Sequence, residues 1–511
     1  MEIQPIIVAV FAAYFAALIG IAIVGARRMR EMSDYVLAGR KMSTFTSALS
    51  ASSSSSSGWT MLVFPALAFS EGTVHLWTAV SIAAGAWFSW TILGKRLRRY
   101  TIAEESLTLP DFFEKRFADR TGTLRTVSAV LTMLFIMFYV NSGLIAGAKL
   151  LETIFGLEHN PSVLITLAAV VSYTFIGGFM AVSRTDVFQS LVMLVSFIIL
   201  PLTLIAATAQ PFTGVGDSPG FMNPLTDAAD DPITWVFLLS TVGWGLGALG
   251  SQRVLQRFMA IESEAKITSS RNIGIVWVIL IFSFGFLLGV VARPALTQMG
   301  LMDELIGETG MLDPELVYFV VSDAFFIPVF TGLLLTGVIA AIMSTADSQL
   351  LLGSAIATDD VPLIRRLARR LELTHVLGAS GRVWLGRALL LAIGSAAGAS
   401  AIIAPDSVSN LVAYAWGGMG AAFGPVTILA LYWRRFNFWG ALASIVAGAG
   451  TVTVWQVTSG GPWGVFDMAI ATAPGFVAAG LAGAAATLLT SQPSTAITEQ
   501  FDRVKTDTPA A

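Results

Sequence analysis

The chain has no cysteine among its 511 residues, and only 12% of these residues are charged. The absence of cysteine excludes disulfide scaffolds, thiolate zinc sites, iron–sulfur clusters and cysteine nucleophiles. Soluble domains carry about 25% charged residues, so charge is scarce, and 30 Lys and Arg against 33 Asp and Glu leave no basic excess for nucleic acid. The chain has instead 55% hydrophobic residues and a mean hydropathy of +0.74. This composition predicts a polytopic membrane protein.

Long apolar runs follow one another through the chain. About 20 apolar residues are needed to cross a hydrocarbon core of about 30 Å, and about thirteen runs meet this criterion. They are continuous and too long for barrel strands, which predicts an all-α protein. The runs cover residues 5–25, 45–70, 76–94, 126–155, 161–181, 184–208, 233–256, 272–292, 320–356, 383–403, 407–432, 437–457 and 468–489. We expect a single transmembrane domain over residues 1–490 and a polar cytoplasmic tail over residues 491–511.

The cations predict the orientation in the membrane, because basic residues concentrate on the cytoplasmic side. With thirteen spans and an outer N-terminus, all Lys and Arg residues except Lys149 and Arg293 fall on the inner side. The connections 209–232 and 297–319 then lie outside, and they contain acidic residues but no Lys or Arg. The longest inner connections, about 95–125 and 357–382, are expected to form short helices. We therefore expect a multi-pass protein of the cell membrane with its N-terminus outside and its C-terminus in the cytoplasm.

Two of the runs are interrupted by small residues, at 52–58 (six serines and a glycine) and at the glycine-rich stretch 243–251. Irregular backbone at membrane depth is tolerated only where it is buried in protein or lines a cavity, which favours a functional break at 52–58. For 243–251 alone, close helix packing is the simpler interpretation. The two stretches fall at the first and sixth positions of a ten-helix series, and paired breaks at matching positions indicate a transporter's binding site. Such breaks offer a helix dipole to a carboxylate and free carbonyls to a cation.

A third polar cluster lies in the run 320–356. Ala341, Ser344 and Thr345 are spaced i, i+3 and i+4, so they share one face of a helix. Two adjacent hydroxyls and a freed carbonyl would form a hard oxygen site that suits a small dehydrated cation.

The ionisable residues inside the runs have two interpretations. Asp347 and Asp186 are functional by default, as ionisable residues within spans are. Alternatively, Asp347 lies at a wet inner end, and Asp186 is a helix-terminal acid paired with Arg184. The three histidines form no HExxH or triad pattern, so an enzyme is not expected.

Several short motifs stand in a fixed order along residues 5–490. They are Ser57-Gly58-Trp59, 107–113 (LTLPDFF), 173–179 (YTFIGGF), 243–247 (GWGLG), 257–260 (RFMA), Met343-Ser344-Thr345, 414–417 (YAWG) and 420–425 (GAAFGP). By the order and spacing of these motifs, the chain resembles the solute:sodium symporter family, and within it the branch of bacterial sodium/proline symporters.

The resemblance implies a leucine-transporter-type fold, a five-plus-five inverted repeat with halves at about 45–208 and 233–432, one extra N-terminal helix and two extra C-terminal helices. It implies secondary active symport by alternating access, in which sodium drives uptake of a small amino acid without a cofactor. The expected partners are this solute, sodium and the lipid bilayer. The resemblance assigns sodium binding to Ser53, Ser56, Ala341, Ser344 and Thr345, with Asp186 as a nearby functional acid. It assigns substrate binding to Ser57, Gly58, Tyr139 and Trp244.

Three positions depart from the family pattern. Proline carriers have an aspartate where this chain has Ser55, and a tyrosine and a proline where it has Ala248 and Gln252. The missing acid leaves proton coupling on the same fold as the nearest alternative; a transporter-like sensor with a separate signalling partner is a second. Ala248 and Gln252 join the expected substrate site, and they predict a larger, more polar pocket than proline alone needs. The expected solute is therefore proline-like or somewhat larger.

Overall fold

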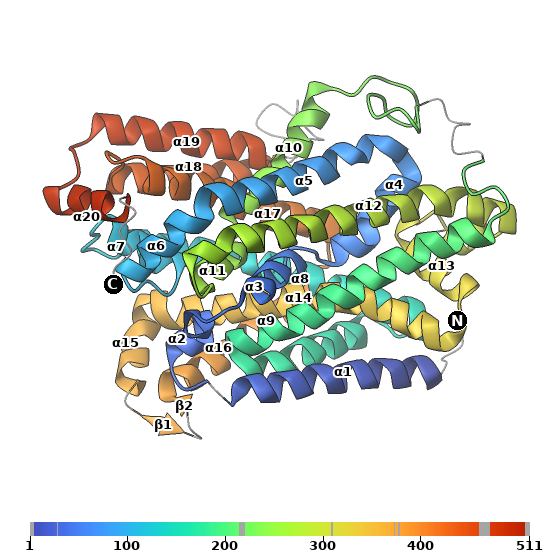
Figure 1. Ribbon diagram of the computed structural model, residues 1–511, viewed down its shortest axis with the longest axis horizontal. Coiled ribbons are helices and arrows are strands. Elements are labelled where there is room, and N and C mark those ends of the chain that lie inside the picture. The colour runs from blue at the N-terminus through green and yellow to red at the C-terminus, as the bar shows by residue number, and fades with distance from the viewer. Residues whose placement is uncertain are drawn as a thin grey trace.

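The structure, a computed structural model, describes residues 5–27, 29–213, 220–307, 310–372, 374–376, 379–458 and 471–505 (Figure 1). Parts of the outer connections (214–219 and 308–309), of the last run (468–470) and of the tail (506–511) lie outside these residues. The helices are α1 (Pro5–Ala26), α2 (Met32–Leu37), α3 (Thr44–Ser53), α4 (Phe64–Glu71), α5 (Leu76–Phe88), α6 (Lys95–Ala103), α7 (Leu109–Arg116), α8 (Thr123–Phe155), α9 (His159–Ala207), α10 (Trp235–Gly250), α11 (Gln252–Ala260), α12 (Ile267–Met299), α13 (Val317–Phe325), α14 (Pro328–Asp360), α15 (Pro362–Leu371), α16 (Gly381–Ile403), α17 (Val408–Tyr432), α18 (Phe438–Val457), α19 (Thr472–Leu489) and α20 (Thr495–Lys505). Two short strands, β1 (His375–Val376) and β2 (Ala379–Ser380), pair antiparallel.

Ten segments of the described chain are long and apolar enough to cross a membrane. One of them is α9, whose 49 residues would reach about 74 Å as a single helix, more than twice the hydrocarbon core. Gly178 divides it, because its φ of 58° and ψ of −173° lie in a region open essentially to glycine alone. The two arms of α9 correspond to the expected runs 161–181 and 184–208. Since α3–α4 and α10–α11 are also divided, the expected thirteen crossings are compatible with the structure.

One expected run is wrong in its boundaries. The run 320–356 is not one helix, because α13 ends at Phe325 and α14 begins at Pro328. The residues between them are extended, and proline at the first position of α14 starts the new helix, since its missing N–H needs no partner there. The polar cluster around Ser344 therefore belongs to α14 alone.

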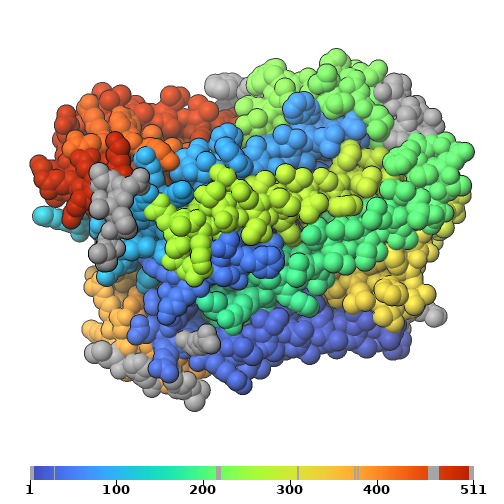
Figure 2. All heavy atoms as spheres, viewed as in Figure 1, coloured from blue at the N-terminus to red at the C-terminus, as the bar shows by residue number. Residues whose placement is uncertain are grey.

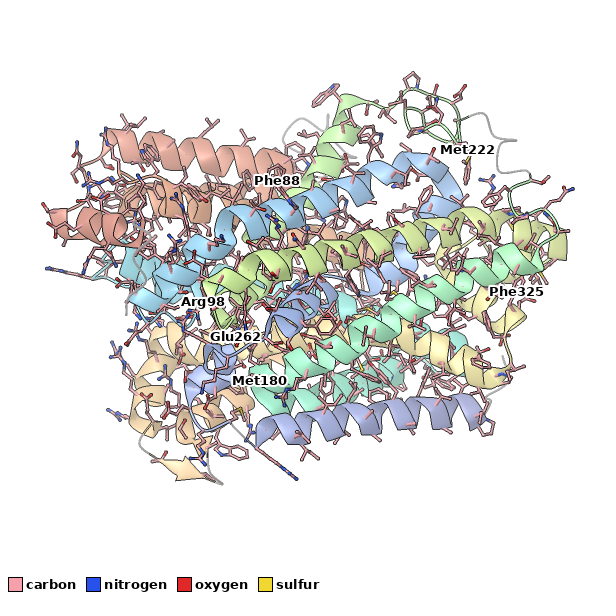
Figure 3. The ribbon with its side chains drawn as sticks, viewed as in Figure 1. Phe88, Arg98, Met180, Met222, Glu262 and Phe325 are labelled. Carbon is pink, nitrogen blue, oxygen red and sulfur yellow. The ribbon has the colours of Figure 1, made fainter. Side chains whose placement is uncertain are left out.

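The long helices run along one axis, and the polar connecting elements gather at the ends (Figure 1). At the left-hand end lie α2, α7, α15, α20 and the hairpin, and Figure 3 places Arg98 and Glu262 toward the same end. Met222 and Phe325 lie at the opposite end. The expected short helices of the connections 95–125 and 357–382 are confirmed as α6, α7 and α15. The tail also forms a helix, α20, in which Phe501 is buried.

The interior of the bundle is built around α14. Every residue from Leu334 to Asp360 is buried, so the polar side chains of this helix must find their partners within the protein. The outer helices α1, α5, α9 and α12 lie side by side on the face shown in Figure 2, and they expose apolar side chains such as Val80 and Val195. Exposed apolar surface of this kind suits contact with lipid.

Candidate functional site

The serine-rich run breaks the second span. α3 ends at Ser53, and helix resumes at Trp59 as a turn of π-helix, η2 (Trp59–Val63), that continues into α4. The hydroxyls of Ser54 and Ser55 donate to the carbonyl of Ala51, at 3.4 and 2.8 Å, and so compete with the helical ladder. The expected break inside the protein is therefore confirmed.

Backbone oxygens at this break contact α14, and that of Ser53 also accepts the Ser56 N–H. The Ser344 hydroxyl lies 3.3 Å from the carbonyl oxygen of Ser53 and 3.3 Å from that of Ala341. Since Ser344 is fully buried, these neutral oxygens form a contact that is closed to bulk water.

A second hydroxyl extends this contact by one residue. The Thr345 hydroxyl lies 3.2 Å from the carbonyl oxygen of Ser54 and 3.3 Å from that of Ser56. The structure thus brings together the oxygens of all five main-chain and hydroxyl positions expected for sodium and adds the Ser54 carbonyl. We call these positions the oxygen cluster: Ser53, Ser54, Ser56, Ala341, Ser344 and Thr345.

The seventh span breaks at one residue. α10 continues through the glycine-rich stretch to Gly250, and Ser251 alone leaves the helix, with ψ of 102°, before α11 begins. The glycines serve close packing instead: a Cβ on Gly245 would lie 2.4 Å from the Ser81 carbonyl oxygen of α5. The expectation of an unwound stretch is wrong over residues 243–250, where helix packing explains the glycines, and correct at Ser251.

A cavity of about 60 Å³ lies between the two breaks. Its walls come from α3, the serine break, η2, α5, the π-helical turn η4 (Ser89–Gly94), α8, α10, α11, α12 and α17, and none of the described residues that line it is charged. Hydroxyls of the serine break face one side. The rest is mainly aliphatic and aromatic, with six aromatic residues: Trp59, Trp90, Tyr139, Trp244, Phe282 and Trp416.

The aromatic residues are held in fixed positions. The rings of Trp59 and Trp244, from the first and second broken spans, stack with centroids 4.3 Å apart. The indole N–H of Trp416 in α17 donates to the Trp244 carbonyl at 2.9 Å. The cavity is therefore a preformed aromatic box joining both breaks, which suits the compact apolar body of a small solute.

Most of the expected substrate residues line this box. Two expected residues, Gly58 and Gln252, are not among its lining. A Cβ on Gly58 would lie 2.7 Å from the Cβ of Ala146, so this glycine permits η2 to approach α8; Gln252 donates to the Thr132 hydroxyl of α8. The four that do line the cavity are Ser57, Tyr139, Trp244 and Ala248.

Sequence reasoning missed two residues of this region. Trp416 lies within the motif 414–417, which contributed to the family resemblance without indicating that this residue lines the cavity. Arg253 directly follows the second break and is fully buried. A charged residue beside a break inside a span was the available signal.

Asp186 is fully buried within α9. Its Oδ2 accepts hydrogen bonds from the Ser50 hydroxyl of α3 (2.6 Å) and from Arg257 of α11 (3.1 Å). Arg257 also donates to Ser348 of α14 at 2.7 Å. The interpretation of Asp186 as a helix-terminal acid paired with Arg184 is wrong, because the acid lies mid-helix and its partner is Arg257. This pair joins four helices, and breaking such a buried pair costs about 3–5 kcal/mol.

Asp347 is also fully buried, so the interpretation of a wet helix end is wrong. Its Oδ2 accepts a hydrogen bond from the Tyr173 hydroxyl at 2.6 Å, while Oδ1 has no partner within the described residues. The acid thus lies between α9 and α14 as part of the buried polar interior.

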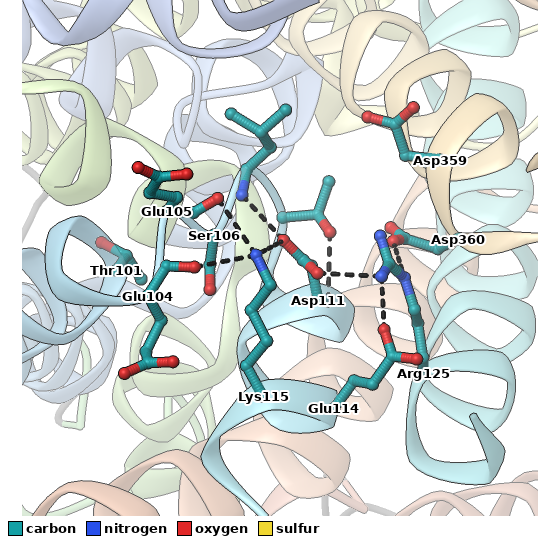
Figure 4. Close-up of polar contacts among 12 residues, drawn as sticks. Thr101, Glu104, Glu105, Ser106, Asp111, Glu114, Lys115, Arg125, Asp359 and Asp360 are labelled. Atoms are coloured by element: carbon teal, nitrogen blue, oxygen red, sulfur yellow. Dashed lines mark hydrogen bonds and ion pairs between the residues drawn. The ribbon is translucent and has the colours of Figure 1, made fainter. Parts of the chain in front are cut away.

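An ion-pair cluster holds the end of the bundle near α7 and α15 (Figure 4). The guanidinium of Arg125 in α8 contacts Asp111 at 2.8 Å, Asp360 at 2.5 Å and also Glu114. Lys115 contacts Asp111 from the other side at 3.1 Å. Because Asp111 and Glu114 belong to α7 and Asp360 ends α14, the cluster fixes the connecting helix to the bundle interior.

These features together define a class of protein. A bundle of membrane-crossing helices, two of them discontinuous and meeting at an uncharged aromatic cavity beside freed carbonyls, is the architecture of a secondary active transporter.

The similarity of the sequence to known proteins identifies the particular family. The chain belongs to the sodium:solute symporter family, whose model matches residues 35–448. It is 34% identical to the osmoregulated proline transporter of Bacillus subtilis (94% of each chain covered) and 35% identical to the high-affinity proline transporter of the same bacterium (93% of this chain, 96% of the relative). It is 34% identical to the sodium/proline symporter of Escherichia coli (98% and 96% covered).

Solved structures show the same fold. A Na⁺-coupled sialic acid symporter, in a substrate-bound outward-open state, aligns with a TM-score of 0.77 at 17% identity, over 96% of this chain and 100% of the other. A nucleobase-cation-symport-1 family transporter in a closed conformation aligns with a TM-score of 0.55 at 15% identity, over 92% and 98%. The expected leucine-transporter-type fold is confirmed. The family membership also confirms a multi-pass membrane transporter rather than an enzyme.

Proposed function

We propose that the protein couples inward sodium flow to uptake of a small amino acid, either proline or a somewhat larger or more polar amino-acid-like solute. The observation that carries the proposal is the oxygen cluster beside the aromatic cavity. The solute class is supported by relatives named as proline transporters at about one-third identity.

The oxygen cluster suits sodium because hard cations prefer neutral or anionic oxygen ligands. In the structure the two α14 hydroxyls donate to the carbonyls. An entering cation would turn their hydrogens away and use the hydroxyl lone pairs together with the carbonyl oxygens. The proposed ligands are the carbonyl oxygens of Ser53, Ser56 and Ala341 and the hydroxyl oxygens of Ser344 and Thr345.

We assign Asp186 a supporting role in sodium binding. Its carboxylate bonds to Ser50, which lies in α3 one turn before the carbonyl of Ser53. The negative charge lies in the layer behind the cluster and is partly neutralised by Arg257. In a low-dielectric interior this charge favours a nearby cation.

The cavity supports binding of one compact solute. The cavity walls include Ser57 of the serine break, Tyr139 of α8, and Trp244 and Ala248 of α10. Gly58 and Gln252 do not line the cavity and support these residues from behind. The small side chain of Ala248 leaves room beyond a proline ring. The solute therefore contacts both halves of the repeat at once.

Symport follows when both ligands favour the same closed state. Sodium links α3 to α14, and the solute links the two broken spans through Trp59 and Trp244. Alternating access is then the movement of one group of helices against the other around the fixed site. Binding of either ligand strengthens binding of the other by the same factor.

The distribution of charge supports an orientation. The helices α6, α7 and α15, at one end of the bundle, carry ten of the 30 Lys and Arg residues, and basic connections stay in the cytoplasm. We propose a cell-membrane protein with the N-terminus outside and the C-terminus inside. We also propose a single transmembrane domain over residues 1–490, with repeat halves at 45–208 and 233–432 and a cytoplasmic tail at 491–511.

Uptake into proteoliposomes tests the proposal. Sodium and proton gradients are imposed separately, and uptake of labelled L-proline and of the other standard amino acids is measured. Concentrative uptake driven by sodium alone is the expected result. Uptake that persists without sodium and collapses with a protonophore would instead establish proton coupling, and no concentrative uptake under either gradient would favour a sensor.

A further inference from the structure

Three consecutive residues at the second break carry buried polar atoms that have no partner in the described part of the chain. These atoms are Ser251 Oγ, Gln252 Oε1, and Nε and Nη1 of Arg253. The three residues are at most 2% exposed. We call them the α11 site, because they start the nine-residue helix α11. Each buried polar atom without a partner calls for an explanation, and a bound ligand is one that fits three such residues in a row.

The α11 site adjoins the transport cavity. Arg253 Nη2 donates to the Tyr139 hydroxyl at 3.0 Å, and the guanidinium carbon lies 4.2 Å from the centroid of the Tyr139 ring. It also lies 5.3 Å from the Trp416 ring. Both rings line the cavity, as do Ala248 and Val254 on either side of the site in sequence. The guanidinium is therefore held against the wall of the cavity by two of its lining residues.

The charge at this place is unbalanced. Arg257, one turn further along α11, has the carboxylate of Asp186, whereas no carboxylate of the described residues contacts Arg253. A buried cation without a partner is costly. The free N–H groups at the start of α11 add partial positive charge, and the cavity itself has no charged lining residue. An anion that enters the cavity would balance this charge directly at the Arg253 guanidinium.

We propose that the α11 site binds the carboxylate of the transported solute, through the Arg253 guanidinium. The proposal rests on the proposed function and deepens it. A guanidinium can bind both oxygens of a carboxylate, and the Tyr139 ring, 4.2 Å from the guanidinium carbon, restricts its position. Sodium at the first break and a carboxylate at the second then neutralise the two ends of the cavity together. The substrate class is a carboxylic acid, and an amide of the same shape is a poor ligand.

The test compares acids with their amides in the full-length protein. Sodium-driven uptake of the labelled amino acid that the protein transports is measured in proteoliposomes. The competitors are L-proline, L-prolinamide, and each other standard amino acid with its α-carboxamide. We expect the wild type to bind the acid at least about 30-fold more tightly than the amide, since truncating one partner of a buried charge pair costs about 2 kcal/mol or more. Arg253→Gln should abolish this ratio, and Arg253→Lys should keep part of it.

Arg387→Gln is the matched control. Arg387 is also buried, lies 4.4 Å from the Trp384 ring, donates to the Ile176 carbonyl and has an unpaired Nε, but none of these contacts is with a residue that lines the cavity. The acid-to-amide ratio of Arg387→Gln should equal that of the wild type. The ratio does not depend on the amount of folded protein. If Arg253→Gln transports nothing, the same pairs are compared by the thermal stabilisation that they give each purified variant.

The outcomes separate this inference from the proposed function. An unchanged ratio in Arg253→Gln overturns the inference while symport stands. A wild type that shows no sodium-driven uptake, but is stabilised by acids and not amides only when Arg253 is present, overturns symport and keeps the carboxylate site. Replacing chloride with sulfate at constant sodium separates a free anion from the solute. If the exchange changes binding of the solute in the wild type but not in Arg253→Gln, and the acid-to-amide ratio is the same in both proteins, the site binds an inorganic anion and the inference is wrong.

Discussion

The two broken spans differ in the chemical groups that each break leaves available to a ligand. At the serine break, α3 ends at Ser53 and the chain offers backbone carbonyls to the hydroxyls of α14. At the second break only Ser251 leaves the helix, and the chain offers the side chains that follow it. Matching positions in an inverted repeat thus need not break alike. The first break presents carbonyl acceptors, which suit a cation, whereas the charged group at the second break is the donor guanidinium of Arg253, which suits an anion.

The residue types explain this difference. Serine hydroxyls return to carbonyls of the preceding turn and substitute for the lost ladder over several residues. Glycine has no side chain to do so. The glycines of α10 instead allow a backbone contact with α5, and this packing keeps the stretch helical up to Gly250.

The largest effect is expected from Gly245→Ala, which tests packing at the second break. The new Cβ would lie 2.4 Å from the Ser81 backbone oxygen, and Gly85, one turn further along α5, is so close that a Cβ on it would lie 2.0 Å from the Gly245 carbonyl oxygen. Backbone cannot move aside as a side chain can, so we expect a loss of about 3 kcal/mol or more. Thermal unfolding in detergent should show it. Gly450→Ala is the control, since nothing lies within 4 Å of its added Cβ. Equal stability of the two variants would show that α10 is not held by this contact.

The next effect concerns the oxygen cluster. The double variant Ser344→Ala, Thr345→Ala removes two neutral oxygens, each worth about 1 kcal/mol. The sodium concentration for half-maximal uptake should rise about 30-fold, which is 2 kcal/mol. Thr336→Ala on the same helix is the control, because its hydroxyl bonds only to the Leu333 carbonyl one turn back. A sodium dependence like that of the control would remove the cluster from the coupling mechanism.

Local pattern was sufficient to predict the α14 part of the oxygen cluster and to favour a break at the serine run, whereas the pairing with Ser53 and Ser56 came from the family resemblance. Ala341, Ser344 and Thr345 share a helix face by spacing alone, and irregular backbone inside a span favours a functional break. The boundary between α13 and α14 was missed but could have been predicted from the sequence, since Pro328 marks a helix start. These features depend on residues close together in sequence.

Features that depend on tertiary contact were not predictable in this way. A glycine run has the same sequence pattern whether it unwinds or packs against a neighbour. The position of the second break could therefore be located only from the contact with α5. The partner of Asp186 lies 71 residues away in α11, and no periodicity identifies it. The unpaired state of Arg253 is likewise a property of the assembled interior.

A smaller effect is expected from Trp244→Ala, which removes the stack that joins the two breaks. Aromatic pairs contribute about 0.5–1.5 kcal/mol beyond their burial, so the solute concentration for half-maximal uptake should rise up to about 10-fold. At saturating solute the sodium requirement should stay near that of the wild type. Trp439→Ala is the control, because this ring is 55% exposed on α18. If Trp244→Ala changed the sodium requirement alone, the cavity and the oxygen cluster would have to exchange roles.

The smallest effect is expected from Ser54→Ala, and it tests whether the serine break acts through its backbone. The Ser54 hydroxyl donates to Ala51 at a long 3.4 Å, whereas its carbonyl oxygen contacts Thr345. Alanine keeps the carbonyl and is small enough for the same turn, so the sodium requirement should change by less than about 3-fold, under 1 kcal/mol. The measurement is the sodium dependence of uptake, beside Ser344→Ala alone. If Ser54→Ala weakened sodium binding as much as Ser344→Ala does, a serine side chain of the break, and not only its backbone carbonyls, would take part in sodium binding. The contrast between a backbone break and a side-chain break would then not hold, because both breaks would act through side chains.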